Sequence, residues 1–303
     1  MMILNKATDP EHNFINEMLI LSYENYNQGY AYPRGDIEDL ENELKTYNLK
    51  VNDCFYIIKN KKKQIGIIGF IDEVERGLII GPVFDINNHT LNNVSLCLEL
   101  LLDMNICKGK VITSNILKEN ILLSNALLKN NFKLTSSHIT MRIQLNDYIY
   151  KNSTSFHNIV EVKLEDSNCL SDIDILFHET LNDWAEEDID SLYDYINEGY
   201  EIVAIIDEQK VKGAIIWIWF DDLGYGRIEY IAVEKGEQRK GFGSKLIDYM
   251  ISNIINKLNI DLPNNLYLDL NQENKEAYEL YIHKGFEVNY LDSVYKLHEE
   301  MKQ

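Results

Sequence analysis

The sequence is poor in cysteine, proline and positive charge. Its 303 residues include 4 Cys, 4 Pro and 7 His, and 29 Lys and Arg oppose 49 Asp and Glu, for a formal net charge of -20. The cysteines form no C-x-x-C pair and the histidines are scattered, so the pattern predicts neither a metal site nor a disulfide framework. We interpret the four cysteines as small buried hydrophobic residues: Cys54, Cys97, Cys107 and Cys169.

Long apolar runs are also missing. No stretch approaches the roughly 20 residues that span a bilayer, and the N-terminal M-M-I-L-N-K-A-T-D-P lacks the apolar core of a secretion signal. The length corresponds to about two average domains. We therefore expect a cytoplasmic protein with two cores and no membrane partner.

The negative charge is concentrated in the second half of the chain. Residues 1–150 contain 15 Lys and Arg and 18 Asp and Glu, whereas residues 151–303 contain 14 and 31. A surface of this sign disfavours nucleic acid as a partner. No Lys or Arg lies between Lys163 and Lys210. The carboxylates of residues 172–194 either attract a cationic ligand or form a solvated helix face, and the sequence leaves both open.

A glycine turn joins a strand pattern to a helix pattern near the C-terminal third of the chain. Residues 227–245 read R-I-E-Y-I-A-V-E-K-G-E-Q-R-K-G-F-G-S-K, and apolar residues then recur at helical spacing through residues 246–255. The turn has the form Gln238-x-x-Gly241-x-Gly243. Its amide N–H groups would point outward at a helix N-terminus, which suits a pyrophosphate that the glycines let approach closely.

Two better-known glycine motifs are excluded by single residues. Phe242 stands where a Walker A loop requires its phosphate-binding lysine, and Leu246 stands where a Rossmann fingerprint requires its third glycine. The turn instead resembles the acyl-CoA loop of the GNAT superfamily of N-acetyltransferases, Q/R-x-x-G-x-G/A after a strand. Downstream, residues 274–286 resemble the family's N-x-x-A-x-x-L-Y-x-x-x-G-F segment, after the strand L-Y-L-D-L.

The N-terminal half repeats the same pattern. The apparent hairpin at 55–70 resembles that at 203–218, and Asn120 and Phe132 lie twelve residues apart, as Asn274 and Phe286 do. We predict two tandem GNAT-like domains, at 1–148 and 156–303. The resemblance implies an α/β (α+β) fold in which each domain has a mixed, mostly antiparallel central sheet flanked by helices.

The first copy is predicted to be degenerate and without cofactor, so that one chain binds one acetyl-CoA. Aligning Val83 with Val233 places side chains where the second copy has bare amides or a hydroxyl. The opposed pairs are Leu91 and Gly241, Asn93 and Gly243, His89 and Arg239, Leu127 and Tyr281, and Asn131 and Gly285. Asparagine tolerates positive φ, so the turn at Asn131 can still form.

The resemblance implies acetyl-CoA as co-substrate, with no metal. A backbone N–H near Ala232 or Val233 would polarise the thioester carbonyl. The residues that the resemblance assigns to acetyl-CoA are Ile231, Ala232, Val233, Gln238, Arg239, Lys240, Gly241, Phe242, Gly243, Ser244, Asn271, Asn274 and Tyr281.

Two side chains are candidates for proton transfer. Tyr281 matches the family's tyrosine beside the sulfur, and its phenol is protonated at neutral pH, so it is the candidate general acid. Glu229 is the candidate base, because strand alternation would place it on the same face as Ile231 and Val233. A carboxylate with only a structural partner is the alternative interpretation of Glu229.

We therefore expect an N-acetyltransferase that transfers acetyl from acetyl-CoA to a primary amine of a small, cationic acceptor by direct attack in a ternary complex. A peptide or protein N-terminal acetyltransferase is a second hypothesis, and a non-catalytic acyl-CoA-binding regulatory protein is a third. Residues 23–35 are rich in tyrosine, which either lines a ligand pocket or domain junction or packs at a helix end.

Overall fold

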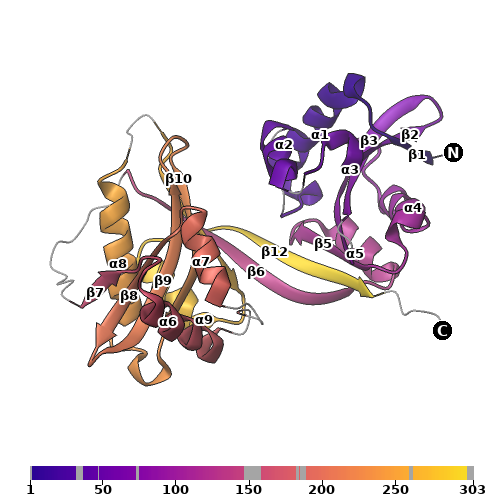
Figure 1. The fold of residues 1–303 in the computed structure, drawn as a ribbon. Coiled ribbons are helices and arrows are strands. Elements are labelled where there is room, and N and C mark those ends of the chain that lie inside the picture. The colour runs from indigo at the N-terminus through magenta and orange to yellow at the C-terminus, as the bar shows by residue number, and fades with distance from the viewer. Residues whose placement is uncertain are drawn as a thin grey trace. The chain divides into compact units, whose positions relative to one another are not determined.

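The computed structural model describes residues 2–31, 37–46, 48–72, 75–146, 158–181, 184, 189–258 and 262–298, with the backbone alone at 39, 42, 43, 46, 189–191 and 298. The chain folds into two compact units (Figure 1). One consists of Met1–His138 together with Tyr290–Gln303, and the other of Ile139–Asn289. None of the helices in the described ranges is long and apolar enough to cross a membrane.

The first unit is a mostly antiparallel sheet with helices packed against it. Its strands are β1 (Met2–Lys6), β2 (Phe55–Asn60), β3 (Lys63–Asp72), β4 (Arg76–Phe84), β5 (Val111–Leu117) and parts of β6 (Lys133–Gln144) and β12 (Glu287–His298). Its helices are η1 (Asp9–Glu11), α1 (His12–Glu24), η2 (Tyr26–Gln28), α2 (Ile37–Thr46), α3 (Val51–Cys54), α4 (Leu91–Leu102), η3 (Asn105–Cys107) and α5 (Ile121–Lys129). The strand order is β1-β2-β3-β4-β5-β12-β6, and β4 and β5 are parallel.

The second unit repeats this plan. Its elements are β7 (Ile159–Glu161), α6 (Ser167–Thr180), α7 (Ile189–Asn197), β8 (Glu201–Asp207), β9 (Lys210–Phe220), β10 (Tyr225–Val233), η4 (Lys235–Glu237), α8 (Phe242–Ile255), β11 (Asn265–Asn271) and α9 (Lys275–His283). The strand order is β6-β11-β10-β9-β8-β7, and β10 and β11 are parallel. The predicted mixed α/β fold class, with a mostly antiparallel arrangement of strands flanked by helices in each unit, is confirmed.

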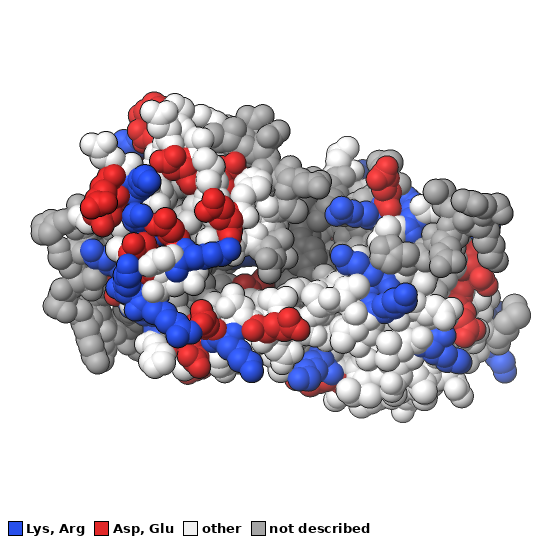
Figure 2. Space-filling model, turned by 90° about the horizontal axis from the view of Figure 1, so that it is seen from below, with Lys and Arg blue, Asp and Glu red and all other residues white. Residues whose placement is uncertain are grey.

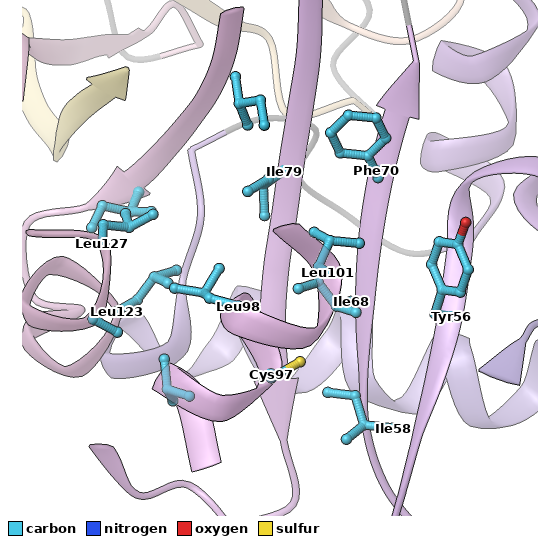
Figure 3. Packing of buried hydrophobic residues seen from close by; sticks show 14 of the residues in the cluster. Tyr56, Ile58, Ile68, Phe70, Ile79, Cys97, Leu98, Leu101, Leu123 and Leu127 are labelled. Atoms are coloured by element: carbon cyan, nitrogen blue, oxygen red, sulfur yellow. The ribbon is translucent and has the colours of Figure 1, made fainter. Parts of the chain in front are cut away.

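Alternating apolar residues of the strands and one face of α4 form a core in the first unit. In Figure 3, Cys97, Leu98 and Leu101 of α4 lie against Ile68 and other strand residues. All four cysteines are free thiols, three of them buried and Cys169 half-buried, and burial raises the pKa of the Cys97 thiol. The buried cysteines therefore behave as small apolar core residues.

Two strands pass from one unit to the other. β6 begins in the first unit and ends in the second, where the N–H of Leu145 just after it donates to the carbonyl of Asn264. β12 begins in the second unit and ends in the first, where Asp292 to His298 pair with β5. The division thus differs from the predicted 1–148 and 156–303, because each half of the chain supplies a strand to the other half's sheet.

The duplication extends to backbone conformation. Asn120 caps α5 with φ -80 and ψ 66, and Asn274 caps α9 with φ -81 and ψ 72. Each side-chain oxygen accepts a hydrogen bond from the N–H three residues on. Asn131 adopts φ +66 where Gly285 has φ +89, so the asparagine makes the same turn as the glycine.

The structure corrects the alignment of the two glycine-loop regions. The N–H of Asp85 donates to the Ile65 carbonyl as that of Glu234 donates to the Lys212 carbonyl, each at 2.9 Å, so Phe84 is equivalent to Val233. The helix cap follows Phe84 by six positions, at Thr90, and follows Val233 by eight, at Gly241. Thr90 therefore corresponds to Gly241 and Asn92 to Gly243, in place of the predicted Leu91 and Asn93.

Candidate active site

The site begins where two parallel strands of the second unit part. Tyr225–Ile228 of β10 pairs with Asn265–Leu268 of β11, and no further pair between these strands follows among the described residues. Because N–H directions alternate along a strand and the Glu234 N–H points to β9, the Val233 N–H points toward the open side. The register thus selects Val233, of the two predicted amides, as the donor that faces the gap.

A cleft of about 760 Å³ extends from this gap. It is lined by the end of α6, the end of β10, the glycine loop and α9 from its cap to its last residue. The lining residues are Thr180, Leu181, Ile231, Ala232, Val233, Gln238, Arg239, Gly241, Phe242, Gly243, Ser244, Asn274, Glu276, Ala277, Glu279, Leu280, Tyr281 and His283. The fold therefore brings 11 of the 13 residues predicted to contact acetyl-CoA to one cleft.

Lys240 and Asn271 are the two that do not line it, and each is engaged elsewhere. The Lys240 ammonium binds the Glu237 carboxylate at 2.9 Å. The Asn271 side-chain oxygen accepts a hydrogen bond from the Glu273 N–H at 2.9 Å, which closes the turn between β11 and α9.

The N-terminus of α8 presents free amides to the cleft. Gly241 caps the helix with φ +90 and offers no side chain to the backbone, and the first helical hydrogen bond runs from the Lys245 N–H to the Gly241 carbonyl. The N–H groups of residues 242–244 have no acceptor in the described part of the chain. Such a helix end attracts an anion through both its amides and its dipole.

Glycine is required at the two loop positions for different reasons, a positive φ at Gly241 and a close neighbour at Gly243. At Gly241, φ +90 strains any residue with a Cβ, although the space beside it is open. At Gly243 a Cβ would lie 3.2 Å from Leu280 Cδ2, so the position is glycine because helix α9 approaches closely. A larger residue at 243 would enter the cleft or push α9 away.

The charged residues of the loop are mostly paired. Arg239 forms an ion pair with Glu276, in which both side chains are largely exposed. On the face shown in Figure 2, basic and acidic side chains are interspersed, with no extended area of one sign. Because exposed ion pairs contribute little, an anion at this helix end would be held mainly by the amides, and Arg239 would add to the binding only after leaving Glu276.

Tyr281 lies in the wall of the cleft with its ring packed edge-on against Phe286, at 5.4 Å between centroids. The side chain is 4% exposed, and burial raises the pKa of its phenol well above the usual 10. Its hydroxyl has no hydrogen-bond partner among the described residues. Tyr281 is therefore a protonated donor that is available to a ligand.

The strand carrying Glu229 contains an extra residue. Ile216 and Trp217 are consecutive in β9, whereas their partners, Tyr230 and Ile228, have Glu229 between them. Such a bulge reverses the alternation of side chains beyond it. The predicted location of Glu229, on the same face as Ile231 and Val233, is therefore wrong.

Glu229 faces a cluster of charged side chains instead. Its carboxylate lies 3.2 Å from the Arg227 guanidinium, which lies 3.6 Å from the Asp269 carboxylate. Burial raises the pKa of Glu229, Arg227 lowers it and Asp269 raises it, with a net rise. Glu229 does not line the cleft, so its role as the base stays a prediction.

Sequence reasoning missed the part of the cleft formed by α6 and by the outer turns of α9. Glu276, Glu279, Leu280 and His283 follow the i, i+3, i+4, i+7 spacing of one helix face, so this pattern in α9 could have indicated them. Thr180 and Leu181 give no such signal, because only the packing of α6 brings them to residues about 50 positions away. Within the described ranges, no group of three or more His, Cys, Asp and Glu side chains is placed to hold a metal ion.

Comparison with known proteins agrees with this geometry. A family model for the acetyltransferase (GNAT) domain matches residues 197–288, and no curated protein sequence matches the chain. A GCN5-related N-acetyltransferase from Sphaerobacter thermophilus is 11% identical with a TM-score of 0.69, over 98% of this chain and 95% of that one.

Two further solved structures are similar along the entire chain. An acetyltransferase of the GNAT family from Colwellia psychrerythraea is 9% identical with a TM-score of 0.58, over 99% of this chain and 100% of its own. A tandem GNAT protein from the clavulanic acid biosynthesis pathway is 8% identical with a TM-score of 0.59, over 100% and 99%. The second unit therefore contains a GNAT acetyltransferase domain, and the whole chain has the fold of GNAT proteins.

Proposed function

We propose that the protein is an acetyl-CoA-dependent N-acetyltransferase that acts on a primary amine of a small, cationic acceptor. The observation that carries the proposal is the cleft beside the end of β10, which has a strand amide at one end and an uncapped helix N-terminus at the other. These groups suit a ligand with an acyl carbonyl, a chain of amides and a pyrophosphate.

The donor half of the site uses backbone groups. The N–H groups of residues 242–244 bind the pyrophosphate, and the free edge of β10 pairs with the amides of the pantetheine chain. The Val233 N–H donates to the thioester carbonyl and stabilises the oxyanion that forms there. The Asn274 side-chain amide is directed at the same ligand, because its oxygen is already used to cap α9.

The reaction requires no covalent enzyme intermediate. The neutral amine attacks the thioester carbon, a tetrahedral oxyanion forms, and the C–S bond then breaks to release the thiolate. Tyr281 donates a proton to the departing sulfur, since burial keeps its phenol protonated. Glu229 accepts the amine's proton through water, and its raised pKa brings it closer to neutral pH than an exposed carboxylate.

The cationic acceptor is proposed from charge. The charged cluster beside β10 contains Glu229 and Asp269 against a single Arg227, and the second half of the chain carries most of the negative charge. A protonated amine is attracted to such a region. A peptide N-terminal amine is the alternative acceptor, and a cytoplasmic location remains a prediction from sequence.

An amine screen with acetyl-CoA tests the proposal. Purified protein is incubated with small polyamines, aminoglycosides, amino acids and short peptides, while free thiol release and the acetylated product are both measured. We expect thiol release that depends on an amine and a product heavier by one acetyl group. Binding of acetyl-CoA without turnover of any amine would instead support the non-catalytic regulatory protein.

A further inference from the structure

The first unit has its own gap between parallel strands. Arg76–Ile79 of β4 pairs with Val111–Ser114 of β5 over four residues, as β10 pairs with β11, and no later pair between the two strands is found in the described chain. Phe84 ends β4 as Val233 ends β10, so its N–H points into this gap. The first unit therefore has the backbone groove that would receive an acyl-CoA.

A nearby segment of the same unit fills this groove. Residues 25–31 connect α1 to the chain before α2, and Gln28 in this segment is 1% exposed. The Gln28 carboxamide donates to the Phe84 carbonyl at 2.9 Å and accepts from the Phe84 N–H at 2.8 Å. A side-chain amide thus makes the paired hydrogen bonds that a ligand amide would make with the end of a free strand.

The other side of the segment pairs with β5. Tyr30 forms an antiparallel bridge with Ile116, and the Ala31 N–H donates to the Asn115 carbonyl at 2.9 Å. The Gly29 carbonyl accepts from the Leu117 N–H at 3.2 Å. Residues 29–31 therefore act as a short added strand along the open edge of β5.

Asn120, the asparagine that caps the helix after β5, is also hydrogen-bonded to this segment. The Asn120 side-chain amide donates to the Gly29 carbonyl at 3.1 Å, while Asn274, its equivalent in the second unit, lines an open cleft. Close packing accompanies this contact, because a Cβ at Gly29 would lie 2.4 Å from Leu117 Cδ1. The segment therefore contacts both walls of the groove and leaves little space beside Leu117.

The helix that would bind the pyrophosphate is closed as well. Thr90 caps α4, and its hydroxyl accepts from the Asn93 N–H at 3.3 Å, whereas Gly241 leaves the equivalent amides free. The Asp85 carboxylate accepts the N–H groups of Asn87 and Asn88 at 3.1 Å. An anion that binds here would have to displace the Thr90 hydroxyl from the helix amide and the Asp85 carboxylate from the two loop amides.

We propose that residues 25–31 are a built-in substitute for the pantetheine chain, which closes the groove of the first unit to acyl-CoA and serves there as a structural strand. The proposal rests on the proposed function for the identity of the excluded ligand. The docking of the segment itself is independent of that function. Tyr30 of this segment accordingly packs and bridges within the first unit and is 2% exposed, whereas Tyr26 is 39% exposed.

Hydrogen exchange of the intact, ligand-free protein tests the docking. The N–H groups of Phe84, Ala31 and Leu117 should exchange slowly, as strand amides do. Gln28→Ala should accelerate exchange at Phe84 at least about tenfold, because a buried amide loses its acceptor. Asn27→Ala is the matched control, since Asn27 is exposed beside Gln28, and it should leave the Phe84 rate unchanged. Exchange of the wild-type Phe84 N–H at the rate of an unstructured peptide would overturn the proposal.

Addition of acetyl-CoA then separates this proposal from the proposed function. Calorimetry should give one site per chain, with the Phe84 exchange rate unchanged by ligand and the Val233 rate lowered. A second site, or protection of Phe84 by acetyl-CoA in a Gly243→Trp protein, would show that the first groove opens to ligand. Absence of any binding in the wild type, with Phe84 still protected, would contradict the proposed function and leave the docked segment established.

Discussion

The two units of this chain share the same arrangement of strands and helix caps, and they differ in what fills the gap between the parted strands. Each has a pair of parallel strands that part after four residue pairs, a helix cap beyond the first strand and an asparagine-capped helix beyond the second. In the first unit the gap holds Gln28, the cap is Thr90 and the position of the tyrosine is Leu127. A ligand site can thus be closed by satisfying its free amides from within, without changing the sheet that creates it.

The largest effect is expected from blocking the open helix end. Gly243→Trp should abolish acetyl-CoA binding in calorimetry, because the indole would enter the cleft beside Leu280. The matched change in the first unit, Asn92→Trp at an exposed position, should leave affinity and stoichiometry unchanged. Equal loss of binding in the two variants would mean that the units do not differ in the way the helix caps indicate.

Removal of the Tyr281 hydroxyl, which has no counterpart in the first unit, should lower kcat without affecting the binding of acetyl-CoA. Tyr281→Phe should reduce kcat by about 10² to 10⁴-fold with the Kd for acetyl-CoA nearly unchanged, because only the transition state needs the proton. Tyr278→Phe, in the same helix but outside the cleft lining, is the control and should retain activity. Wild-type kcat in Tyr281→Phe, with chemistry rate-limiting, would remove Tyr281 from the mechanism.

The pH profile should reveal Glu229. A base acts only when deprotonated, so kcat should rise with pH through the pKa of Glu229, which burial moves above the usual 4.5. Glu229→Gln should lower kcat by about 10²-fold and abolish this rise. Asp269→Asn removes a neighbouring negative charge that raises the pKa, so the rise should move to lower pH. The assay should use an acceptor with a weakly basic amine, so that ionisation of the amine does not mask the ionisation of Glu229.

The smallest effect should come from the exposed cation of the loop. Arg239→Ala should weaken acetyl-CoA binding by about 2 to 5-fold, because the guanidinium is exposed and already paired with Glu276. Lys240→Ala should change affinity less, since Lys240 is outside the cleft lining. A loss of 100-fold in Arg239→Ala would show that side-chain charge, more than the helix amides, holds the phosphates.

The donor half of the site could be predicted from sequence because its residues have a local geometric meaning. Gly241 needs a positive φ, Asn274 caps a helix, and the loop follows a strand, so short motifs place all three. The bulge at Glu229 reverses the side of the strand on which this side chain lies, and the shorter loop before Thr90 shifts the alignment of the two units. No local sequence pattern shows either feature. Their location depends on the register between strands, which is set by tertiary packing.

The sharing of β6 and β12 has a consequence for how this protein can be divided. A cut in the connecting segment 147–157 would give a first fragment without the strand that pairs with β5 and a second without the strand that pairs with β11. Each fragment would expose an unpaired strand edge, which invites aggregation. Co-expressed, the two pieces could each restore the other's sheet, so the chain is a candidate for split-protein complementation.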